Sequence, residues 1–161
     1  MAAVVIGLGS NLGDSHQYLN EAIARLDPIR STDRILKSSI YESSPIDCPP
    51  GSPAFLNAVV EIDSELRPLE ILEFTQGLER DLGRRQKRAL NEARTIDLDL
   101  LFIDDLVLDH AQLSLPHPRI SERLFVLLPL KEIRPDLCPA SLLNALENQD
   151  VRRRDDLAWE D

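Results

Sequence analysis

The feature that most constrains this chain is the alternation of apolar and acidic side chains in residues 96–100. Side chains on a strand alternate between faces, so the three apolar residues can enter a core while Asp97 and Asp99 share the opposite face. Their α-carbons would lie roughly 6.5 to 7 Å apart, from which both carboxylates can reach one divalent cation or a pair of them. The pattern predicts a half-buried strand with a candidate metal site. Acids that only face water are the alternative.

A dense group of basic residues precedes this strand. Residues 80–94 contain six of the 18 basic residues of a chain whose formal net charge is -10. Arginines beside metal-binding carboxylates suit a metal-bound polyphosphate, because the acids hold the cations and the arginines neutralise the remaining phosphate oxygens. For any single arginine here, a solvated helix end is the alternative.

Length and composition limit the classes of protein to which the chain can belong. A chain of 161 residues, 43% hydrophobic, predicts one domain over residues 1–161, with a frayed charged tail from about residue 150. The sequence has neither a long apolar run nor a secretory signal pattern, so a cytoplasmic protein without a membrane partner is expected. Cys48 and Cys138 are interpreted as free thiols. The acidic balance argues against nucleic-acid binding.

Hydrophobic periodicity predicts alternating strands and helices. Strands are expected at about residues 4–8, 35–42, 55–62, 95–102 and 106–108, and helices at about 15–26, 68–82, 119–133 and 141–148. The order strand, helix, strand, strand, helix, strand predicts an α+β, ferredoxin-like split βαβ fold. Its antiparallel sheet would carry helices on one face, and the extra C-terminal helices would pack around it. The three glycines of residues 7–13 do not fit a dinucleotide-binding spacing, and residues 9–14 are expected to form a turn.

Two other places offer ligand contacts. In the strand at residues 55–62, Leu56, Ala58, Val60 and Ile62 are expected to face the core, whereas Phe55, Asn57, Val59 and Glu61 share the opposite face. Phe55 and Asn57 suit stacking and hydrogen bonding to a flat heterocycle, although a strand-end aromatic with a turn-capping asparagine is the alternative. His117 lies between two prolines, which excludes a helix interior or a central strand and predicts a restrained, exposed turn. With Arg119 and Arg123 it would add phosphate donors from a second direction.

Several motifs together resemble the 6-hydroxymethyl-7,8-dihydropterin pyrophosphokinase family of folate biosynthesis. They are residues 6–14, 41–45, 55–57, 94–99 and 116–119, followed by Arg123 and Phe125. They run in the family's order between about residues 3 and 139. The Arg-Thr-Ile-Asp-Leu-Asp and Pro-His-Pro-Arg blocks make the resemblance specific.

The resemblance implies that the β,γ-pyrophosphoryl group of ATP is transferred to the hydroxymethyl oxygen of the dihydropterin, releasing AMP. It implies two Mg2+ ions held by Asp97 and Asp99, and catalysis by these two residues with Arg84 and Arg94. A monomer is expected. The implied ATP contacts are Gln76, Glu79, Arg84, Arg94, Leu100, Ser114, His117 and Arg123. The implied pterin contacts are Ser44, Pro45, Ile46, Phe55, Asn57 and Phe125, with the two phenylalanines enclosing the ring.

Two departures from the family pattern affect the predicted nucleotide loop. Residues 91–93 are Asn-Glu-Ala where the family has an aromatic residue followed by Gly-Pro, and Gln86 stands where an arginine is expected. A catalytically silent, ligand-binding family member is therefore one alternative. An RNA-binding ferredoxin-like module is the other, although 4% aromatic content supplies few side chains for base stacking.

Overall fold

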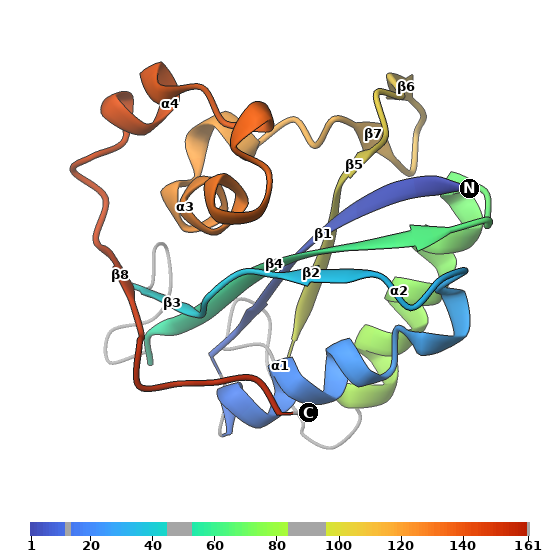
Figure 1. The fold of residues 1–161 in the computed structure, drawn as a ribbon, viewed down its shortest axis with the longest axis horizontal. Helices are drawn as coiled ribbons and strands as arrows, with labels where there is room; N and C mark the ends of the chain where they lie inside the picture. Colours follow the sequence, from blue (N-terminus) through green and yellow to red (C-terminus); the bar gives the residue numbers. More distant parts are fainter. Residues whose placement is uncertain (12–13, 45–52, 84–95, 161) are drawn as a thin grey trace.

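The computed structural model is an antiparallel sheet with helices on both faces, and it describes residues 1–11, 14–44, 53–83 and 96–160 (Figure 1). The strands are β1 Ala2–Ser10, β2 Ile35–Lys37, β3 Tyr41–Ser43, β4 Phe55–Ser64, β5 Asp97–Ile103, β6 Leu108–Asp109, β7 Ser114–Leu115 and β8 Val151–Arg153. The α-helices are α1 Ser15–Ala24, α2 Pro68–Gly83, α3 Leu124–Ile133 and α4 Ala140–Ala145. Short 3-10 turns are Asp27–Ile29, Ile120–Glu122 and Pro135–Leu137.

The main sheet has the strand order β5-β1-β4-β3-β8, and β2 also pairs with β4. The described strand pairs are antiparallel, and the long strands β1 and β4 form the centre in a continuous register from Ala2↔Ser64 to Ser10↔Leu56. Helices α1 and α2 cover one face, whereas α3 and α4 cover the other (Figure 1). The predicted mixed α and β class with an antiparallel sheet is therefore confirmed.

Both faces of the central strands are buried. On one face Val4, Ile6 and the neighbouring apolar residues of β4 and β5 pack with the buried sides of α1 and α2. On the other face Val5, Val59 and Leu101 pack with α3. The predicted core face of residues 55–62 is confirmed, but the opposite face is also covered, because α3 lies over it.

The strand predicted over residues 35–42 is interrupted. Residues 38–40 form an irregular segment between β2 and β3, which both pair with β4. The Ser38 side chain explains the break, because its hydroxyl replaces a backbone group and accepts the hydrogen bond of Val59 N at 2.9 Å. The Ser38 carbonyl is then available to Trp159 Nε1, which donates to it at 2.7 Å. A local bulge of this kind is not visible in hydrophobic periodicity.

The bounds of one further strand and of one helix were predicted wrongly. Residues 106–107 do not continue a return strand against β5; β6 instead begins at Leu108 and pairs with β7. Helix α3 begins at Leu124, because Ile120–Glu122 form a separate 3-10 turn before it.

The C-terminal segment is ordered against the domain, so the expected frayed tail is wrong for residues 151–160. Strand β8 pairs with β3 in the register Tyr41↔Arg153 to Ser43↔Val151. Beyond it the chain crosses to α1, where Glu160 N donates to Asn20 Oδ1 at 2.8 Å. Pairing with a strand edge and side-chain contacts to a helix hold a segment whose composition is strongly charged.

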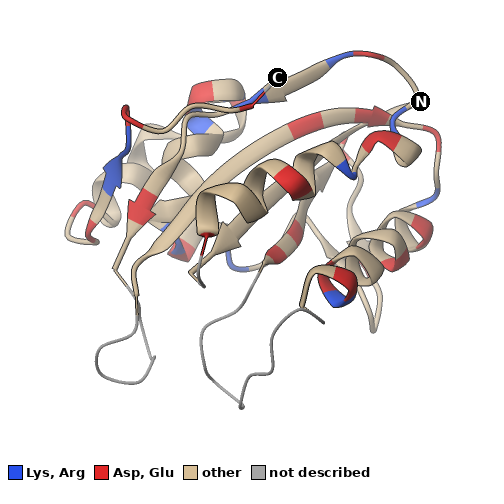
Figure 2. Ribbon diagram, turned by 90° about the horizontal axis from the view of Figure 1, so that it is seen from below, with Lys and Arg blue, Asp and Glu red and all other residues tan. Residues whose placement is uncertain are grey.

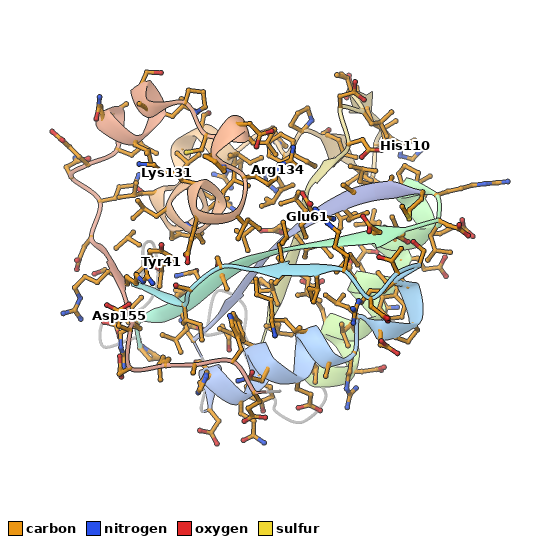
Figure 3. All side chains as sticks on the ribbon, viewed as in Figure 1. Tyr41, Glu61, His110, Lys131, Arg134 and Asp155 are labelled. Atoms are coloured by element: carbon orange, nitrogen blue, oxygen red, sulfur yellow. The ribbon has the colours of Figure 1, made fainter. Side chains whose placement is uncertain are left out.

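Glu61 is fully buried on β4 beneath α3 and is held by two arginines. Arg34 and Arg134 each donate a hydrogen bond to its carboxylate, and Figure 3 shows Glu61 beside Arg134. Arg34 also pairs with Asp63 and Arg134 with Asp136, at 3.0 and 2.8 Å. The network joins the segment before β2 to the end of α3 across the central strand.

Four other features concern the sequence-based expectations. Cys138 is a buried free thiol, and Cys48 lies outside the described residues. Acidic residues are spread over the described helices and strands with basic residues among them (Figure 2). Five of the six basic residues of the 80–94 cluster lie outside the described ranges. Within those ranges, no helix is long and apolar enough to cross a membrane.

Candidate functional site

A cavity of about 980 Å³ lies over the α3 side of strands β1, β4 and β5. Helix α2, the 110–114 segment around β7, the His117 turn and the beginning of α3 complete its walls. Such a volume accommodates ligands of nucleotide or drug size. The cavity therefore joins the two parts of the sequence that were predicted to bind phosphate and a flat ring.

Glycines of β1 form the floor of this cavity. Gly9 stands between Asn57 of β4 and Asp97 of β5, and Gly7 stands between Val59 and Asp99, in the register of the sheet. A Cβ atom at Gly9 would lie 3.3 Å from Asn57 Oδ1. At the two glycines, therefore, no side chain covers the backbone between the Asn57 amide and the two carboxylates. The sequence interpretation placed Gly7 in a strand, as observed, but assigned Gly9 to a turn, whereas β1 continues through Gly9 to Ser10.

The acidic pair lies on the cavity side of β5. Asp97 and Asp99 are both half-buried and line the cavity, while the intervening Leu98 is 5% exposed and packs in the core behind the sheet. Glu79 of α2 accepts the hydrogen bond of Leu98 N at 2.8 Å. This contact ties α2 to the backbone between the aspartates. Adjacent carboxylates open to a cavity are suitable ligands for a divalent cation.

Arg123 connects the acidic pair to an aromatic ring. Its Nη1 atom lies 3.5 Å from Asp99 Oδ2, and its guanidinium carbon lies 5.7 Å from the centre of the Phe125 ring. A guanidinium in this position combines charge pairing with a cation–π contact. Its remaining N–H groups are suited to phosphate oxygens.

The predicted His117 turn is confirmed, although His117 is half-buried instead of exposed. His117 N donates to Leu101 O at 3.0 Å, which fixes the turn to β5. Arg119 N donates to His117 Nδ1 at 3.1 Å, so we assign the proton of the neutral ring to Nε2. Burial lowers the pKa of His117, against the opposing effect of the Asp99 charge. The neutral imidazole is therefore the favoured form near pH 7.

The opposite wall contains an aromatic ring and an oriented amide. Asn57 is 3% exposed, and its Nδ2 atom donates to Ser43 Oγ at 2.8 Å. Phe55 is half-buried at the start of β4, and Phe125 is half-buried on α3. The internal hydrogen bond fixes the Asn57 side chain, with Oδ1 beside Gly9. This wall offers ring surfaces and a fixed amide to a flat heterocycle.

Every described member of the predicted site lines this one cavity. On the predicted nucleotide side these are Gln76, Glu79, Asp97, Asp99, Leu100, Ser114, His117 and Arg123. On the predicted pterin side these are Ser44, Phe55, Asn57 and Phe125. Pro45, Ile46, Arg84 and Arg94 lie outside the described residues.

Several lining residues were not predicted. They include His110, Gln112, Glu122 and Gln149. The first two come from the turn between β6 and β7, and Gln149 comes from the segment interpreted as the start of a tail. No local pattern marks these residues, because their position depends on how distant segments pack.

Comparisons with known proteins identify the family of the chain. A family model described as "7,8-dihydro-6-hydroxymethylpterin-pyrophosphokinase (HPPK)" matches residues 5–135. A relative from Bacillus subtilis (strain 168) is 44% identical over 128 residues, which cover 80% of this chain and 75% of the relative. A relative from Porphyromonas gingivalis is 42% identical over 142 residues, covering 86% of this chain and 95% of the relative. Both are named 2-amino-4-hydroxy-6-hydroxymethyldihydropteridine pyrophosphokinase.

Solved structures share the fold at low sequence identity. "Crystal Structure Analysis of the HPPK-DHPS in complex with substrates" aligns with a TM-score of 0.68 at 14% identity and covers 89% of this chain. Wild-type Plasmodium falciparum HPPK-DHPS with SDX-DHP aligns with a TM-score of 0.64 at 15% identity, covering 83% of this chain. The chain spans 43% and 41% of these longer proteins.

The motif resemblance is thus confirmed by comparisons that cover most of the sequence. The chain belongs to the 7,8-dihydro-6-hydroxymethylpterin-pyrophosphokinase family.

Proposed function

We propose that this protein transfers the β,γ-pyrophosphoryl group of ATP to the hydroxymethyl oxygen of 6-hydroxymethyl-7,8-dihydropterin, giving the pterin diphosphate and AMP. As a family member it is a pyrophosphokinase of folate biosynthesis. The observation that supports the substrate assignment most directly is the shared cavity. It is lined by the acidic pair and Arg123 at one end and by Phe55 and Asn57 at the other.

Two Mg2+ ions are the proposed cofactor, held by Asp97 and Asp99. The fit rests on two half-buried carboxylates on the cavity face of a strand, because Mg2+ favours one or two carboxylates together with substrate phosphates. When bound, the metal supplies charge neutralisation and polarisation of phosphoryl oxygens. On binding the metal, Asp99 would give up part of its ion pair with Arg123. The Arg123 guanidinium would then be available to bind phosphate.

The reaction joins the hydroxymethyl oxygen to the β-phosphorus and breaks the bond to the oxygen that leaves with AMP. Such a transfer asks the protein mainly to align two substrates and to neutralise charge. Arg123 and the Nε2–H of His117 would donate to phosphate oxygens from one wall, and Gln76 and Glu79 would border the nucleotide from α2. Arg84 and Arg94 are proposed to complete the cation set.

The pterin is proposed to lie between Phe55 and Phe125. Asn57 would then read its polar edge, together with Ser44 and the backbone of residues 45–46. The buried hydrogen bond from Asn57 to Ser43 supports this role, because the amide is already oriented before a ligand enters. A preorganised amide favours a heterocycle with a matching donor and acceptor edge.

Other features of the sequence interpretation stay proposals. The strand order β5-β1-β4-β3 with α1 and α2 on one face supports the ferredoxin-like split βαβ arrangement. A single domain over residues 1–161 and a cytoplasmic location are proposed from the length and composition, and a monomer is proposed with them. No nucleic-acid partner is proposed for a chain of net charge -10.

Incubation of the purified protein with ATP, Mg2+ and hydroxymethyldihydropterin tests the proposed reaction. AMP and pterin diphosphate should appear in equal amounts by chromatography, and only when both substrates are present. Tight binding of a fluorescent nucleotide without AMP formation would instead identify a silent family member. A gel shift with RNA and no nucleotide binding would favour the RNA-binding alternative.

Replacing Phe55 with alanine should weaken pterin binding about 5- to 150-fold, which corresponds to about 1 to 3 kcal/mol of lost stacking and buried aromatic surface. Calorimetric titration with pterin and, separately, with MgATP measures the effect. ATP affinity should change far less. Phe102→Ala is the matched control, because Phe102 packs beside the α3 core and does not line the cavity. Equal losses for both ligands would remove Phe55 from the pterin wall.

A further inference from the structure

Two adjacent residues of the C-terminal segment, Gln149 and Asp150, contact both walls of the cavity. They lie beyond residues 5–135, the part matched by the family model. We propose that they are positioning residues: Gln149 fixes the start of α3, which carries Arg123 and Phe125, and Asp150 fixes Ser44 at the end of β3. The inference rests on the proposed function, because it assigns these walls to the nucleotide and the pterin.

Gln149 caps α3 from outside the helix. Its Oε1 atom accepts the hydrogen bond of Leu124 N at 3.0 Å, and its Nε2 atom donates to Glu122 O at 3.0 Å. The first N–H groups of a helix have no partner within the helix and need an acceptor. Among the described residues, the side chain at the N-cap position, Arg123, makes no capping hydrogen bond. Gln149 therefore supplies the acceptor that a capping side chain usually provides.

The two hydrogen bonds of Gln149 fix the backbone on both sides of Arg123. Arg123 contacts Asp99 and the ring of Phe125, so a shift of this backbone would move the guanidinium and the ring together. Gln149 is itself half-buried and lines the cavity. Its capping role thus acts directly on groups proposed to bind phosphate and pterin. A misplacement of about 1 Å is large enough to slow a transfer that depends on alignment.

Asp150 fixes the opposite wall. Its Oδ2 atom accepts a hydrogen bond from Ser44 Oγ at 2.6 Å, and its carbonyl accepts one from Ser44 N at 3.3 Å. The next residue, Val151, pairs with Ser43, whose hydroxyl accepts the bond that orients Asn57. The pterin-facing end of β3 is therefore held by the C-terminal segment and by β4 at once.

Two substitutions of Gln149 distinguish the effect of its capping hydrogen bonds from the effect of its side-chain shape. Gln149→Met keeps a similar volume but removes both hydrogen bonds, and we expect kcat to fall about tenfold with a several-fold rise in the Kd for pterin. Gln149→Glu keeps the acceptor for Leu124 N but loses the donor to Glu122 O, so it should restore part of the pterin affinity. Pterin is the ligand compared, because the added charge of glutamate would itself oppose a triphosphate.

Asp150→Ala should raise the Kd for pterin several-fold and leave the Kd for MgATP unchanged, because Ser44 lies on the proposed pterin wall alone. The matched control is Asp155→Ala in the same segment, since Asp155 pairs with its neighbour Arg153 at 2.7 Å and does not line the cavity. This control should behave as the unchanged protein.

Calorimetry gives both Kd values, steady-state assays give kcat and KM, and a urea titration confirms that each variant is folded. The inference is overturned if Gln149→Met and Asp150→Ala keep the native Kd and kcat, or if Gln149→Glu is no better than Gln149→Met for pterin. It is also overturned if Asp150→Ala weakens both ligands equally. Failure of the proposed function would look different, because the unchanged protein would then bind neither ligand or release no AMP.

Discussion

Asp97→Ala and Asp99→Ala should each abolish pyrophosphoryl transfer, with kcat lowered by at least about 10³-fold, or about 4 kcal/mol in activation free energy. Each change removes one of the two carboxylates proposed to hold Mg2+, and the metal cannot then neutralise the phosphate oxygens during transfer. Both residues are half-buried on the cavity side of β5, outside the packed core. The proteins should therefore stay folded and should bind pterin alone better than they catalyse transfer.

Steady-state assays over a range of Mg2+ concentrations measure this loss, with circular dichroism as the folding check. Asp109→Ala is the matched control, because Asp109 is exposed on β6 and does not line the cavity. Asp97→Asn and Asp99→Asn should also be inactive, since an amide keeps the shape but loses the charge. Near-native turnover of either alanine variant would show that the metal is held elsewhere.

Removal of the buried Glu61 carboxylate should have the largest effect on stability. Glu61→Ala is expected to lower the free energy of unfolding by about 3 kcal/mol, the lower end of the range for breaking a buried ion pair. The lower end applies because Arg34 and Arg134 are partly exposed and keep Asp63 and Asp136 as partners. The loss combines the removal of two charge-assisted hydrogen bonds to the Glu61 carboxylate with a cavity beneath α3.

Glu42 provides a matched control for this prediction. It also accepts hydrogen bonds from two arginines, Arg152 and Arg154, but its side chain is 22% exposed, compared with 0% for Glu61. Glu42→Ala should therefore cost less than about 1 kcal/mol, as expected of pairs near the surface. Urea unfolding of both variants measures the difference. Equal costs would mean that burial of Glu61 does not set its contribution.

The parts of the site that the sequence predicted are those encoded by local pattern. The alternation around Asp97 and Asp99 fixes which side chains leave the core, and the structure places both on the cavity side of β5. The same reasoning placed Phe55 and Asn57 on one face of β4. A strand period of two residues determines these directions whatever lies on the other side of the sheet.

The parts that the sequence did not predict depend on distant packing. Glu61 was expected to lie on the face of its strand opposite the core, because nothing local shows that α3 covers that face. Gln149 was assigned to the edge of a charged tail, although Leu124 N and Glu122 O hold it beside the cavity. The break at Ser38 likewise depends on a hydroxyl that replaces one backbone bond. The roles of Arg84, Arg94, Pro45 and Ile46 stay predictions, because these residues lie outside the described ranges.

The central claim is that one cavity aligns ATP and a hydroxymethyl pterin for transfer of two phosphates together. A ³¹P NMR time course of the purified protein with ATP, Mg2+ and hydroxymethyldihydropterin tests it most directly. The account predicts that ATP resonances are replaced by those of AMP and of a diphosphate ester in a one-to-one ratio, and that Asp97→Asn stops the change. Formation of ADP and a pterin monophosphate, or unchanged ATP with both substrates bound, would contradict it.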